Sequence, residues 1–236
     1  MKSMPKNRSS SYRQARRIDY ADKRFSRLKS AAVTRATRQI AAICGKACKA
    51  GLMDGLSGNA SQRITEDTFL ITSSGISKGA LISSDFALLE IKGKQLLGRK
   101  KPSSEWRLHA ALYGKFSNCK AILHTHPKNL QALAWRLAEG GQTLDRMFSA
   151  PLDEGAIWAN RFAIAKDAPL GSPELGQNAA AAFFSGQANT PLAIWLPRHG
   201  LCAFGDALKE VLNITSELEH IACVMLKYLA SGGQLN

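Results

Sequence analysis

Short apolar runs alternate with amphipathic stretches from about residue 31 to the end of this chain, and this alternation restricts the possible folds more than any other feature. From Leu208 to Met225, for example, apolar residues recur every three or four positions, which is the spacing of a helix with one buried face. Prolines open the inner helices, and Asp206 is expected to cap the last one. Helices are expected at residues 31–50, 102–116, 127–139 and 172–184, and from Asp206 onward.

The apolar runs between these helices are too short to be helices and are rich in strand-forming residues. Strands are expected at residues 61–64, 69–72, 86–91, 120–124, 192–196 and 200–204. The tight turn at residues 65–67 joins two of these strands as a hairpin, which makes that pair antiparallel, and the turn at residues 92–94 closes the strand at 86–91. The predicted fold class is therefore α/β, a three-layer α/β/α domain over residues 31–236 with a central mixed, largely antiparallel sheet.

The positive charge of the chain is concentrated at its start. Residues 1–38 hold 12 of the 32 Lys and Arg but only two acidic residues, so they account for +10 of the net charge of +14 and leave +4 for the rest. The composition of residues 1–30 predicts a disordered basic tail, because it contains too few apolar residues to offset its ordering entropy. An RNA or membrane-surface contact, a targeting peptide and an overextended translation start are the alternatives for this tail.

An apolar run that ends in His-x-His is the most specific local motif. In Ala121–Pro127, His124 and His126 are two residues apart on a predicted strand, so both imidazoles point to the same face and can converge on one ion. The five cysteines lie in apolar neighbourhoods without the spacing of a structural zinc site, and they indicate a reducing, cytoplasmic location. A site that keeps one position open for water or substrate is typical of catalytic zinc.

His199 is the best third ligand, because it lies between two short strands where a side chain can project from the edge of the sheet. His109 and His220 lie within predicted helices, and both are expected to be packed or hydrogen-bonded imidazoles. His124, His126 and His199 are thus the candidate ligands of one metal site, and a His-x-His pair that occurs by chance or on an exposed strand is the alternative.

Three further stretches can bind an anion. Ser103, Ser104 and Glu105 stand at a predicted helix start, where backbone amides and the helix dipole favour phosphate. The small-residue turns at residues 58–61 and 73–76 offer amides in the same way. Each of these stretches also has a structural interpretation, as a capped helix start or as a plain turn.

Taken in order, these motifs resemble the class II aldolase/adducin family over about residues 35–230. The matching stretches are GNASQR, FLITSSGIS, KPSSEWRLHAALY, AILHTHP and RHGLCAFG, and they are most similar to those of family members that cleave L-fuculose 1-phosphate. The resemblance implies one Zn²⁺ per subunit on the three histidines, with Glu105 as the acid/base. It also implies that the substrate phosphate is bound by Asn59, Ser74, Gly75, Ser103 and Ser104.

The resemblance further implies the reaction and its alternatives. The expected activity is a zinc-dependent aldehyde-lyase reaction, a retro-aldol cleavage of a ketose 1-phosphate to dihydroxyacetone phosphate and an aldehyde, in a cytoplasmic homotetramer with sites between subunits. A dehydratase, a decarboxylase, a 4-epimerase and a non-catalytic adducin-like binding protein are the alternatives. The epimerases have Asp where this chain has Glu105.

No tyrosine lies between His126 and His199 in this chain. The aldehyde specificity is therefore expected to differ from that of the family aldolases that have a tyrosine in this region. Nucleic acid is not expected as a partner, nor is a membrane.

Overall fold

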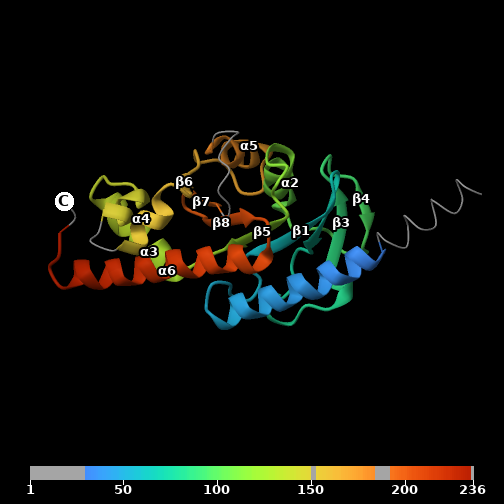
Figure 1. Cartoon of the computed structure of the whole chain (residues 1–236), viewed down its shortest axis with the longest axis horizontal. Coiled ribbons are helices and arrows are strands. Elements are labelled where there is room, and N and C mark those ends of the chain that lie inside the picture. Colours follow the sequence, from blue (N-terminus) through green and yellow to red (C-terminus); the bar gives the residue numbers. More distant parts are fainter. Residues whose placement is uncertain (1–29, 150–152, 184–191, 235–236) are drawn as a thin grey trace, which may run out of the picture.

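The computed structural model describes residues 30–149, 153–183 and 192–234, within which eight strands form one sheet (Figure 1). The order of the strands is β4-β3-β2-β1-β5-β8-β7-β6, and every neighbouring pair is antiparallel except the parallel pair β6–β7. The predicted mixed, largely antiparallel sheet is therefore confirmed. The strands are β1 Asn59–Thr65, β2 Thr68–Thr72, β3 Phe86–Glu90, β4 Gln95–Leu97, β5 Ala121–Thr125, β6 Phe162–Ile164, β7 Leu192–Leu196 and β8 Gly200–Gly205.

The helices of the described residues follow the predicted pattern with one addition, α4. A helix over residues 30–49 opens the described part of the chain, and the 23-residue helix α6 nearly closes it. The others are α2 Trp106–Lys115, α3 Lys128–Glu139, α4 Asp153–Ala159, α5 Pro173–Ala181 and α6 Leu208–Ala230, with 3-10 turns η1 Lys78–Ala80, η2 Ser83–Asp85 and η3 Leu144–Ser149.

The helices cover both faces of the sheet. Helices α2 and α5 lie on one face, and α3, α6 and the helix over residues 30–49 lie on the other (Figure 1). The central strand β5 contributes to both layers, because Leu123 packs in the core with α3 and α6 whereas Ile122 packs in the core with α2 and α5. Two hydrophobic cores separated by one sheet confirm the predicted three-layer arrangement.

Three predicted helix starts are wrong by one to four residues. Helix α2 begins at Trp106 rather than at Pro102, because Pro102 forms an isolated β-bridge with Ser73 and the Ser103 amide donates to the Thr72 carbonyl, which keeps this stretch extended. The N-cap of α6 is Ala207 rather than Asp206. Pro127 is the N-cap of α3 rather than its first residue.

Elements beyond the predicted set lie at the two edges of the sheet. Strand β4 extends the hairpin from β3, and β6 adds a parallel edge strand to β7. Almost all of the predicted basic tail, residues 1–29, lies outside the described residues. Among the helices of the described residues, none combines the length and the apolar character that crossing a membrane requires.

Candidate metal centre

Two antiparallel neighbours in the middle of the sheet bring the three predicted ligands together. His124 lies in β5 and His126 directly follows this strand, while His199 lies in the turn before β8. Thr125 pairs with Leu201, so the end of β5 adjoins the start of β8. One ligand atom from each of the three histidines lies within 4.8 Å of the others. We refer to His124, His126 and His199 as the histidine centre.

The state of His124 suits a metal ligand. Its Nδ1 lies 3.0 Å from the Leu201 carbonyl oxygen and donates to it, which leaves the Nε2 lone pair free. That Nε2 lies 3.0 Å from His126 Nε2 and 3.1 Å from His199 Nε2. Burial lowers the pKa of His124 to about 3 and also lowers the pKa of His126, so both are neutral at physiological pH. Three imidazole nitrogens that converge on one point fit a divalent metal ion with an open position.

Two glycines leave room for this convergence. A Cβ on Gly58 would lie 2.6 Å from the His124 carbonyl oxygen, and the residue has φ +73°. A Cβ on Gly200 would lie 2.5 Å from the Thr125 carbonyl oxygen and 2.8 Å from His126 Cδ2. The glycines of the GN and HG motifs are thus explained by the close approach of the histidine-bearing backbone.

Glu105 reaches the histidine centre from the helical layer that contains α2. It is the N-cap of α2 and is 5% exposed. One carboxylate oxygen lies 3.0 Å from His199 Nε2 and the other 3.3 Å from His124 Nε2. Burial alone would raise the pKa of the Glu105 carboxyl, but His124, His199 and Asn59 together hold it below its usual range. The site therefore contains an ionised carboxylate beside the predicted ligands.

Asn59 contacts Glu105 directly. It begins β1, opposite His124 of β5, and its Nδ2 donates to a Glu105 oxygen over 2.7 Å. The side chain is 2% exposed. The amide has a second N–H, so the predicted phosphate contact is compatible with this position.

The other four predicted phosphate residues lie near the end of β2, which adjoins the start of β1 that holds Asn59. The Ser74 amide donates to the Lys101 carbonyl, which brings the turn with Gly75 beside the segment that holds Ser103 and Ser104. Ser103 is buried and its hydroxyl accepts from the Glu105 amide over 3.3 Å, whereas Ser74, Gly75 and Ser104 are exposed. Two exposed serines and an exposed glycine thus lie in the segments next to the carboxylate.

Sequence reasoning missed one group of polar residues. Ser61, His109 and Tyr113 are buried and form a hydrogen-bonded chain that ends on Asn59. The prediction that His109 is a hydrogen-bonded imidazole is confirmed, but the same prediction for His220 is wrong, because His220 is exposed on α6. Helical spacing would have grouped His109 with Tyr113, but their strand partner could be identified only from the fold.

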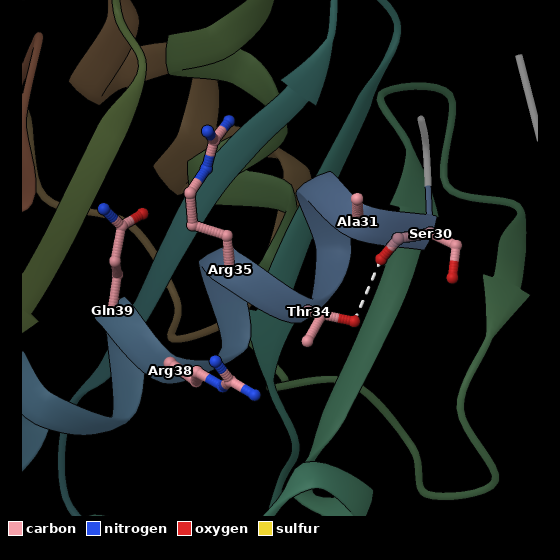
Figure 2. A pocket seen from close by; sticks show the side chains of 6 residues that line it. All are labelled: Ser30, Ala31, Thr34, Arg35, Arg38 and Gln39. Carbon is pink, nitrogen blue, oxygen red and sulfur yellow. Dashed lines mark hydrogen bonds between the residues drawn. The ribbon is translucent and has the colours of Figure 1, made fainter. Parts of the chain in front are cut away.

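A separate hollow lies along the helix over residues 30–49 (Figure 2). Figure 2 shows two basic side chains there, Arg35 and Arg38, beside a hydrogen bond from the Thr34 hydroxyl to the Ser30 carbonyl. None of its lining residues belongs to the histidine centre or to the predicted phosphate set. It adds nothing to the candidate metal centre.

Residues 38–226 match the family described as Class II Aldolase and Adducin N-terminal domain. The chain belongs to this family. L-fuculose phosphate aldolase of Escherichia coli is 32% identical over 194 residues, which cover 82% of this chain and 83% of that protein. Methylthioribulose-1-phosphate dehydratase of Microcystis aeruginosa is 28% identical and covers 83% of this chain and 95% of its own.

A solved structure extends the similarity to the fold. The sugar-phosphate aldolase from Thermotoga maritima matches with a TM-score of 0.73 at 27% identity, over 85% of this chain and 97% of that chain. The matched residues 38–226 include the histidine centre and Glu105. The chain is therefore a class II aldolase-like protein with a three-histidine cluster suited to a divalent metal ion.

Proposed function

We propose that this chain is a zinc-dependent aldolase that cleaves a ketose 1-phosphate, such as L-fuculose 1-phosphate, to dihydroxyacetone phosphate and an aldehyde. The observation that carries the proposal is the placement of the Glu105 carboxylate 3.0 Å and 3.3 Å from two of the three converging imidazoles. The similarity to L-fuculose phosphate aldolase supports it. A retro-aldol reaction requires both a cation for developing negative charge and a base beside it.

The first requirement is met by the donor set. Three histidine nitrogens would hold zinc with a position open for substrate oxygens. Bound there, the ion would supply Lewis-acid stabilisation of the enediolate charge that forms when the carbon–carbon bond breaks. The chain's own contribution is to keep the imidazoles neutral and convergent, through burial of His124 and through its hydrogen bond to Leu201.

The second requirement is met by Glu105. In this role its carboxylate moves the proton at the carbon next to the substrate carbonyl. Asn59 holds one oxygen of the carboxylate over 2.7 Å, and the N-cap position at α2 fixes the backbone. Ser74, Gly75 and Ser104 would bind the phosphate from the adjoining turns, so that the reacting carbons lie over the histidine centre.

The carboxylate has a direct test. Glu105→Gln should retain metal but lose about 10²–10⁴-fold in turnover, because the amide can accept a hydrogen bond yet cannot take up the proton. Glu217→Gln on the exposed side of α6 is the matched control and should behave like wild type. A Glu105→Gln enzyme with full turnover would remove this residue from the mechanism.

The reaction class needs a separate experiment. Bound metal should be measured, and a panel of ketose 1-phosphates assayed for release of dihydroxyacetone phosphate. Zinc with release supports the aldolase. The similarity to a methylthioribulose-1-phosphate dehydratase makes dehydration the second candidate, and loss of water without carbon–carbon cleavage would establish it instead. Purified protein without a divalent metal would contradict both.

We also expect a homotetramer with sites between subunits, as the family resemblance implies. Light scattering on the purified protein should give four times the chain mass of 25.6 kDa. A monomeric mass would contradict this expectation. Nucleic-acid binding that survives deletion of residues 1–30 would favour a third candidate, a nucleic-acid-binding protein, because the basic tail could not then account for the binding.

A further inference from the structure

A buried chain of side chains runs from Glu105 to the far end of the α2 layer. Asn59 Nδ2 lies 2.7 Å from Glu105, and Asn59 Oδ1 lies 2.5 Å from His109 Nε2. The chain continues from His109 Nδ1 to the Ser61 hydroxyl over 2.7 Å, and from there to the Tyr113 hydroxyl over 2.8 Å. All four side chains from Asn59 to Tyr113 are at most 2% exposed. These side chains are therefore shielded from bulk water.

The direction of every hydrogen bond in this series of side chains follows from the Glu105 carboxylate at one end. An ionised carboxylate can only accept, so the Asn59 amide must turn its NH₂ group toward Glu105 and its oxygen toward His109. That oxygen can only accept, so His109 must carry its proton on Nε2. Nδ1 then accepts from the Ser61 hydroxyl, which in turn accepts from the Tyr113 hydroxyl.

The reverse direction leaves an unmatched contact. If Ser61 donated to Tyr113 and His109 carried its proton on Nδ1, the bare Nε2 would face the Asn59 oxygen at 2.5 Å without a proton between them. Burial also lowers the pKa of His109 to about 4, so the doubly protonated ring is not formed at neutral pH. One protonation pattern alone satisfies every partner.

We propose that His109, oriented by Ser61 and Tyr113, is a positioning residue that fixes which edge of the Asn59 amide faces Glu105. The Nε2–H group holds the Asn59 oxygen and so prevents the amide from turning that oxygen toward the carboxylate. With the NH₂ group at the site, one N–H binds Glu105 and the second is available to a substrate oxygen. The consequence for substrate rests on the proposed function, whereas the orientation itself does not.

The orientation can be tested without any substrate. In the ¹⁵N-histidine NMR spectrum of the purified holoprotein at pH 7, His109 should appear as the neutral ring with the proton on Nε2, assigned by its loss in His109→Gln. A ring protonated on Nδ1, or on both nitrogens, would overturn the inference. Because this readout needs no turnover, the predicted ring state in a protein without aldolase activity would sink the proposed function and leave the orientation standing.

The role toward substrate has its own pair of variants. His109→Leu removes the donor, whereas the His109→Gln amide can present an N–H to Asn59 at nearly the same place. With inorganic phosphate as the probe, His109→Leu should bind about 10–100-fold more weakly and lower kcat/KM by a similar factor, and His109→Gln should recover most of both. Metal content should be that of wild type in both variants.

Two outcomes would contradict the positioning role. A purely structural role would lower the folded fraction and hence the apparent kcat, but would leave the phosphate affinity of the folded enzyme unchanged. Equal impairment of the two variants would likewise mean that the hydrogen bond to Asn59 is not what matters. If His109→Leu does not fold, Ser61→Ala is the second variant, because it keeps the ring and removes the hydroxyl that Nδ1 accepts from. Its His109 NMR signal should change from the single ring state of wild type to a mixture, and an unchanged single state would contradict the role of Ser61.

Discussion

Gly200 is the position at which the smallest covalent change should disturb the histidine centre. A methyl group added there would lie 2.5 Å from the Thr125 carbonyl oxygen, 2.8 Å from His126 Cδ2 and 3.3 Å from His124 Cε1. Non-bonded carbon atoms normally stay about 3.5–4.0 Å from their neighbours. The first two contacts must therefore open by roughly 0.7–1 Å, and both lie on the segment that holds two predicted ligands.

The size of the effect follows from that displacement. Overpacking of a well-packed site costs about 1–3 kcal/mol, which should appear as a lower free energy of unfolding for Gly200→Ala. Functional groups need to be held within about 0.5 Å, so a shift of this size also exceeds the tolerance of a metal centre. We expect the affinity for zinc to fall by about 10–100-fold, the range seen when groups that orient metal ligands are removed.

The assay compares two glycine-to-alanine variants. Zinc affinity is measured by chelator competition and stability by urea unfolding of the metal-free protein. Gly114→Ala in α2 is the matched control, because a Cβ there meets only an ordinary contact at 3.9 Å and alanine favours the helix. Gly114→Ala should bind zinc like wild type, and its free energy of unfolding should rise by up to about 1 kcal/mol. Unchanged zinc affinity and stability in Gly200→Ala would refute the reasoning from close approach.

Three further predictions concern stability. Removal of metal with a chelator should lower the melting temperature reversibly, and re-addition of zinc should restore it, because the ion binds only the folded histidine centre. Glu219 of α6 accepts hydrogen bonds from the backbone amides of Asn129 and Leu130 at the start of α3. Glu219→Ala should lower the free energy of unfolding in urea by about 1–3 kcal/mol, whereas Glu217→Ala at an exposed position should leave it unchanged. The pKa of His109 is about 4 in the folded protein against an ordinary value of 6.5. Between these two pH values His109 binds a proton only in the unfolded state, which favours unfolding. The free energy of unfolding that is present above pH 6.5 should therefore fall by roughly 3 kcal/mol as the pH falls through 4. His109→Gln should lack this part of the pH dependence.

The features that could be predicted from the sequence are those with a local signature. A strand that ends in His-x-His places two imidazoles on one face whatever the rest of the fold does, and a histidine in a short turn between strands is poised to join them. The alternation of strands and helices likewise predicts layers. His124, His126 and His199 do converge, and Glu105 lies beside two of them.

The features that were missed depend on partners distant in sequence. His109 contacts Ser61 and Asn59, which are 48 and 50 residues away, and these segments meet only in the folded chain, where β1 pairs with β5, the strand that follows α2. The start of α2 was placed too early because the bridge between Ser73 and Pro102 is a tertiary contact that local proline rules do not contain. The parallel strand β6 has three residues, too few for a periodic signal.

The sequence separation of the ligands also bears on how the chain folds. His124 and His199 are 75 residues apart, and they meet only once β8 has paired with β5. Contacts at such separation are slow to form, because a long loop must close before they contribute. A chain emerging from the ribosome would therefore carry an incomplete centre until β8 had been synthesised and docked. Metal capture would then report the completion of the sheet, and the rate of zinc uptake during refolding would measure when its two halves join.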